Sequence, residues 1–208
     1  MDRHPGRAEP APGGLVGVLG AYWFGGGPAD TAKMEPEQRD VLRTWRGDTA
    51  AGRRLLALWR ERAAQDSTDG FSHRAVALLE AKLAVDRRDP TAPRLVDVAD
   101  SLWQGRDGVS TWGSLELARL YEQQGRVDRA LRAVRRRWIP MGEPEPAGLA
   151  ESYRLEGRLA GLADDKIGAM RAYRSYLRLR VDPEPSRIPQ LDSVRAELRA
   201  LGDLKVGS

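Results

Sequence analysis

The sequence contains no cysteine, and only two of its 208 residues are histidines, His4 and His73. Without thiols the chain can form neither disulfide bonds nor thiolate metal sites, and it has no cysteine nucleophile. Two histidines give little material for a histidine-rich metal site or a Ser-His-Asp triad. His73 has Ala77, which is no metal ligand, four residues later in its expected helix. We therefore predict no metal, no cofactor and no thiol chemistry.

Lysine is scarce too, with only Lys33, Lys82, Lys166 and Lys205, so arginine supplies almost all of the positive charge. The 34 Lys and Arg exceed the 30 Asp and Glu by only four. The pI of about 9.7 alone does not indicate nucleic-acid binding, which normally needs a clustered patch. Arg135–Arg137 is interpreted as a solvated helix end, with an anion-binding patch as the alternative.

Long hydrophobic runs are missing as well. The longest, Leu15–Phe24, has about ten residues, about half of what a membrane-spanning helix needs. The preceding residues are weakly basic and rich in Pro and Gly. Two interpretations stay open: a flexible leader whose apolar run packs on the first helices, or a signal peptide or anchor remnant. A cytoplasmic location is favoured, with membrane tethering or export as the alternative.

Alternation of apolar and polar residues, as in strands, is also absent, whereas helical spacing recurs from residue 31 onward. Proline, glycine and aspartate clusters separate the segments, as in Asp66–Gly70 and Asp182–Pro189. These signals predict an all-α protein of nine helices. The first is expected at 36–45, and the second runs from the interruption at 47–49 to about 64. The others are expected at 71–86, 92 or 93 to 103, 112–124, 127–138, 149–162, 165–180 and 191–201.

No motif for catalysis is found. The glycines at 25–27 are not followed by the lysine and Ser/Thr of a phosphate-binding loop. Glu143 and Glu145 are close carboxylates in a proline-rich loop, where water surrounds them. Asp164 and Asp165 are better explained as the start of a helix, where acidic side chains offset the helix dipole. We therefore predict that the protein is not an enzyme.

The stretch LARLYEQQGRVDRALRAV, residues 117–134, contains the best-formed helical hairpin. Leu117, Ala118 and Tyr121 share its first helix, Gly125 makes the turn, and Ala130 lies where the second helix needs a small residue. This spacing resembles the tetratricopeptide repeat, a helix pair of about 34 residues. The pattern recurs more weakly in three other hairpins. The hairpin at 71–104 matches least well. In the first hairpin Ala51 or Gly52 takes the place of Ala130, and in the last Ala169 does.

The resemblance covers about residues 31–201 and implies a right-handed superhelical array of about four antiparallel helix pairs with a C-terminal capping helix. Residues 1–30 would be a flexible leader and 202–208 a disordered tail. The part from Gly157 onward also resembles repeat regions attached to bacterial serine/threonine kinases or transcriptional regulators. The kinase motifs themselves are absent, so kinase activity does not carry over.

In such an array the first helix of each pair lines the concave face. We expect Arg119, Gln123, Arg154 and Arg158 to point into that groove, where arginines would bind an acidic peptide or a C-terminal carboxylate. The alternative is that these arginines pair with Glu122, Glu151 and Glu156 on the same surface.

The predicted function is a non-enzymatic scaffold or adaptor that holds a partner peptide or helix. No small-molecule substrate is evident. The alternatives are a helical protein that binds anionic surfaces or nucleic acid, and a peripheral subunit of a membrane-associated assembly.

Overall fold

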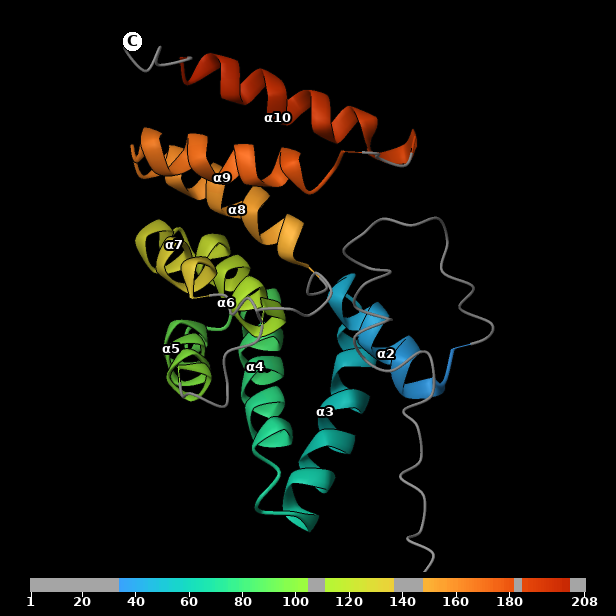
Figure 1. The fold of residues 1–208 in the computed structure, drawn as a ribbon. Coiled ribbons are helices and arrows are strands. Elements are labelled where there is room, and N and C mark those ends of the chain that lie inside the picture. Colours follow the sequence, from blue (N-terminus) through green and yellow to red (C-terminus); the bar gives the residue numbers. More distant parts are fainter. Residues whose placement is uncertain (1–33, 105–110, 137–147, 182–184, 203–208) are drawn as a thin grey trace, which may run out of the picture.

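The computed structural model describes residues 34–104, 111–136, 148–181 and 185–202, and all its regular structure there is helical (Figure 1). The predicted all-α class is confirmed for this part of the chain. The apolar run of the leader, the loop around residues 139–147 and most of the C-terminal tail lie outside it. The nine α-helices are α2 (Pro36–Trp45), α3 (Thr49–Gln65), α4 (Gly70–Asp86), α5 (Ala92–Trp103), α6 (Thr111–Gln123), α7 (Val127–Arg135), α8 (Leu149–Leu162), α9 (Lys166–Arg178) and α10 (Ile188–Ala200), the last preceded by a 3₁₀ turn, η1 (Pro185–Arg187).

Local signals explain where most of these helices begin. Pro36 occupies the first turn of α2, where its missing N–H costs nothing, and Glu35 forms a capping box with Gln38. The interruption predicted at residues 47–49 falls between α2 and α3, with Thr49 already in α3. The Asp48 carboxylate accepts hydrogen bonds from the backbone N–H groups of Ala50 and Ala51, so the helix begins at Thr49.

The helices form four hairpins, α2/α3, α4/α5, α6/α7 and α8/α9, followed by α10 (Figure 1). Each hairpin packs on the next through the contacts α3–α4, α5–α6, α7–α8 and α9–α10. The first helices of three consecutive hairpins also meet, because α4 contacts α6 and α6 contacts α8. The helices α4, α6 and α8 therefore lie next to one another in the stack.

One backbone turn recurs in all four hairpins. Its central residue adopts the left-handed conformation, with φ of 95°, 55°, 71° and 58°. The next N–H donates to the carbonyl five residues earlier, at 2.8–2.9 Å, which is the Schellman ending of a helix. The bond recurs at spacings of 41, 37 and 39 residues, so the four hairpins share one type of turn. The four turn residues are Gly47, Arg88, Gly125 and Asp164.

This turn makes a stability prediction. Gly125→Ala should lower the free energy of unfolding by about 1–2 kcal/mol, because the added Cβ is strained in the left-handed region. Arg88→Gly should raise it by about 0.5 kcal/mol, the relieved strain being partly offset by the larger entropy of glycine in the unfolded chain. Urea unfolding of both variants checks the pair. A neutral Gly125→Ala would contradict this account of the turn.

Small residues permit close approach of the helices at one position after the turn. Ala130 and Ala169, each five residues beyond it, are fully buried. In the first hairpin Gly52 holds this place, and a Cβ there would lie 2.6 Å from Leu83 Cδ2. Of the two candidates in the sequence, Gly52 therefore makes the close contact.

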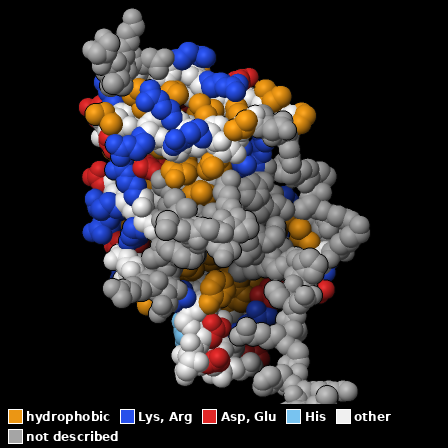
Figure 2. All heavy atoms as spheres, in the orientation of Figure 1, with side chains coloured by type: hydrophobic (Ala, Val, Ile, Leu, Met, Phe, Trp, Pro, Cys, Tyr) orange, Lys and Arg blue, Asp and Glu red, His pale blue; other side chains and the backbone are white. Residues whose placement is uncertain are grey.

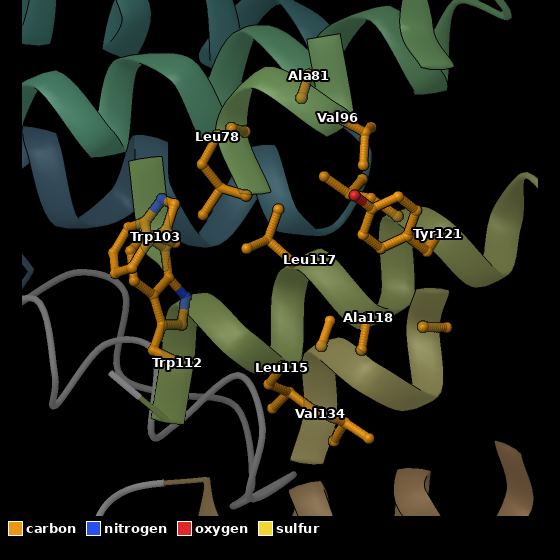
Figure 3. Close-up of a cluster of buried hydrophobic side chains, with 14 of the residues drawn as sticks. Leu78, Ala81, Val96, Trp103, Trp112, Leu115, Leu117, Ala118, Tyr121 and Val134 are labelled. Atoms are coloured by element: carbon orange, nitrogen blue, oxygen red, sulfur yellow. The ribbon is translucent and has the colours of Figure 1, made fainter. Parts of the chain in front are cut away.

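The main core extends through all four hairpins and contains five aromatic side chains, those of Trp45, Trp59, Trp103, Trp112 and Tyr121. The ring centroids of Trp103 and Trp112 lie 5.5 Å apart, and those of Trp45 and Trp112 lie 5.8 Å apart. Figure 3 shows Trp103 and Trp112 at one end of the cluster and Tyr121 at the other. Trp45 belongs to α2, so the first hairpin contacts the third as well as the second.

Candidate partner-binding site

The four residues predicted to bind a partner lie on two neighbouring helices. Arg119 and Gln123 are four residues apart on α6, and Arg154 and Arg158 are four apart on α8. Four-residue spacing places each pair on one face of its helix, and α6 packs on α8.

Each of the three arginines forms an ion pair with a glutamate. Arg119 Nη1 donates to Glu116 at 2.7 Å, and Arg154 Nε donates to Glu151 at 2.9 Å. Arg158 donates through both terminal nitrogens to Glu122, which lies on α6, and so ties the third hairpin to the fourth. Pairing with Glu122 and Glu151 is the alternative considered from sequence. Gln123 is exposed.

Two buried residues next to this surface, Glu116 and Lys82, were missed from sequence. Glu116 was not considered as a partner for Arg119, although it lies three residues before it, at helical contact distance. Lys82 on α4 lies six residues before its turn residue, as Arg119 and Arg158 do before theirs. Aligning the hairpins by their turns would have revealed this row of cations. Lys82 is paired as well, donating to Asp86 at 2.7 Å.

The carboxylates lie deeper than the arginines that they bind. The side chains of Glu116 and Glu151 are 5% and 2% exposed, whereas those of Arg119, Arg154 and Arg158 are 26%, 36% and 48% exposed. Each guanidinium carries five N–H donors, and the bond to its glutamate uses one or two of them. The buried glutamates therefore hold the arginines in place and leave N–H donors directed at solvent.

Two tyrosines behind this surface are held in their neutral form. Burial, the hydrogen bond to Glu197 and the charge of Glu197 raise the pKa of Tyr173. Burial raises the pKa of Tyr176, and the charge of Glu151 adds to the increase. The Tyr173 hydroxyl donates to Glu197 of α10, and that of Tyr176 to Gln190 at 3.0 Å. Both hydroxyls fasten α10 to α9.

Within residues 34–104, 111–136, 148–181 and 185–202, no group of three or more His, Asp and Glu side chains is arranged to hold a metal ion. None of the helices in these ranges is long and apolar enough to cross a membrane.

Comparison with known proteins gives no relative. No protein-family model matches the chain, and neither the curated proteins nor the solved structures contain a match.

Proposed function

We propose that this protein is a non-enzymatic scaffold of the tetratricopeptide type, which binds a segment of a partner protein along α4, α6 and α8. The observation that carries the proposal is the turn found in all four hairpins, with its left-handed residue and its 6→1 hydrogen bond. Stacked copies of one hairpin provide an extended surface to which each unit adds one position. The buried small residues Gly52, Ala130 and Ala169 support the same assignment.

Recognition would depend on the outward-facing guanidinium groups. Arg119, Arg154 and Arg158 are fixed by their glutamates before any partner arrives, which reduces the entropy lost on binding. A carboxylate of the partner would accept the N–H groups that the glutamates leave unused, in charge-assisted hydrogen bonds. An acidic peptide, or a C-terminal carboxylate, is the ligand that fits.

Affinity capture with quantitative mass spectrometry tests this role. The variant R119Q/R154Q/R158Q should recover its specific partner at least roughly tenfold less than the native chain, because each lost charged hydrogen bond is worth about one decade or more. Glutamine can still donate an amide N–H to each glutamate, so the fold is expected to persist, and circular dichroism checks this. Unchanged recovery would refute this surface.

The matched control, R171Q/R174Q/R178Q, removes the same charge from α9. It also tests the alternative of anionic-surface or nucleic-acid binding, which one observation favours. Between Lys166 and Arg178, α9 carries four cations and no acidic residue. Figure 2 shows Lys and Arg side chains gathered around α9 and α10. Binding to random DNA that falls steeply with salt and is lost in the α9 variant alone would favour the alternative.

A further inference from the structure

A second surface, separate from the row of cations on α4, α6 and α8, has the shape of a binding groove. It lies between α3, α4 and α5 and has a volume of about 600 Å³. Leu83 of α4 is buried beneath it, and Leu56 of α3 and Leu95 of α5 are half-buried in its walls. Arg53 and Arg87, both exposed, line it as well. An apolar floor with cationic walls suits a ligand that is both aliphatic and anionic.

Arg53 and Arg87 lack the ion pair with a glutamate that Arg119, Arg154 and Arg158 each have. In the part of the chain that the structure describes, no carboxylate forms an ion pair with Arg53 or Arg87. The acids of the groove are already bonded: Glu80 accepts from Arg60 at 2.6 Å, and Asp89 accepts from the Thr91 hydroxyl at 2.6 Å. The charge of Asp89 still acts on Arg87, and the three arginines of the lining exceed its two acids by one.

At the next two junctions between hairpins, ion pairs connect the neighbouring hairpins. Arg126 of the third hairpin donates to Asp97 of α5 at 2.8 Å, which bridges the second junction. Arg135 of α7 donates to Glu156 at 3.0 Å and also to Asp165, which bridges the third. At both junctions an arginine on one hairpin binds a carboxylate on its neighbour.

The first junction lacks both bridges because of three substitutions in the repeat. Counted from the turn residues Gly47 and Arg88, Leu56 takes the place of Asp97, Asp89 takes that of Arg126, and Ala57 takes that of Arg135. Among the described residues, the Arg60–Glu80 pair is the one ion pair that spans this junction. Glu80 and Asp89 hold the places of Glu156 and Asp165, so compared with its neighbours this junction lacks the acid Asp97 and the two bridging arginines.

We infer that this groove binds an acidic, aliphatic segment of a partner protein: a Leu, Ile or Val side chain rests on the leucines while a neighbouring Asp or Glu binds Arg53 and Arg87. The partner's carboxylate would supply the acid that Asp97 supplies at the second junction and that Leu56 does not supply here. The inference rests on the proposed scaffold function but assigns it a surface other than the one formed by α6 and α8.

Selection from a random peptide library displayed on phage, against the full chain, provides the probe. Enriched peptides should carry Asp or Glu beside an aliphatic residue. Their synthetic copies, measured by fluorescence anisotropy, should bind R53Q/R87Q at least roughly tenfold more weakly. Ala57→Glu should weaken them similarly, since it places an internal carboxylate four residues from Arg53 on an exposed helix position. The matched control R171Q/R178Q should bind like the native chain.

The outcomes separate the two claims. Peptides that enrich but lose affinity only in R119Q/R154Q/R158Q would overturn the groove and leave the scaffold function standing. If no peptide is enriched, the result counts against both the groove and the scaffold function. Peptides that bind R53Q/R87Q or Ala57→Glu as they bind the native chain would also overturn the groove. Because Ala57→Glu removes no native contact, its result does not depend on how the fold tolerates R53Q/R87Q.

Discussion

Gly157→Ala is expected to lower the free energy of unfolding by about 2 kcal/mol, whereas Gly161→Ala on the same helix should raise it by up to about 1 kcal/mol. A Cβ on Gly157 would overlap the ring atoms of Tyr173, while a Cβ on Gly161 would meet nothing within 4 Å. Both substitutions gain up to about 1 kcal/mol of helix propensity. Overpacking a core typically costs about 1–3 kcal/mol. The clash with Tyr173 therefore outweighs the gain in helix propensity, and Gly157→Ala lowers the free energy of unfolding.

Tyr173 has little room to yield to the new methyl group. Its side chain is buried between α8 and α10, and its hydroxyl donates to Glu197. Displacing the ring would therefore also loosen α10. Chemical denaturation of both variants provides the measurement, and a Gly157→Ala variant as stable as Gly161→Ala would show that the helices are not in close contact there.

Arg136→Met is expected to lower the free energy of unfolding by about 2 kcal/mol, because it leaves a buried carboxylate without its cation. Asp100 is 4% exposed and accepts hydrogen bonds from Arg136, from Gln104 and from the Tyr121 hydroxyl at 3.0 Å. Removing one partner of a fully buried pair costs about 3–5 kcal/mol. The smaller figure applies here because the Arg136 side chain is 30% exposed.

A double-mutant cycle isolates this effect from lost packing. In an Asp100→Asn background the charge is gone, so Arg136→Met should cost under about 1 kcal/mol. Arg132→Met, one turn earlier on the exposed face of α7, serves as the control and should change stability by less than about 0.5 kcal/mol. Equal costs of Arg136→Met in both backgrounds would show that the pair is not coupled.

Helix boundaries that are set by residues close to one another in the chain could be predicted from the sequence. Pro36 and the Gly47–Asp48 turn act within a few residues, so the helices that they delimit are recognisable without a structure. The left-handed turn at Arg88 was not recognised, because arginine is not a residue that favours that conformation. There the neighbouring helices impose the turn on an unsuitable residue.

The ion pairs of the surface were harder to predict, because their members are far apart in the chain. Pairing with Glu122 was considered from sequence, but Arg136 and Asp100, which are 36 residues apart, were not matched. Arg135 and Arg136 lie at the end of α7 and are partly exposed, as the interpretation of a solvated helix end implies, but their ion pairs were not predicted. Both arginines bind carboxylates of adjacent hairpins. Sequence spacing indicates which side of a helix an arginine occupies, but the packing of the hairpins selects its acid.

The contact between Trp45 and Trp112 has a consequence for how the molecule unfolds. In a strictly linear array each unit would depend on its two neighbours alone, and the end unit could fray without disturbing the third. Here the indole of α2 packs against that of α6, with ring centroids 5.8 Å apart, so the loss of the first hairpin also exposes the third. The first three hairpins are thereby linked into a single cooperative block, and fraying from this end has to break all of it together.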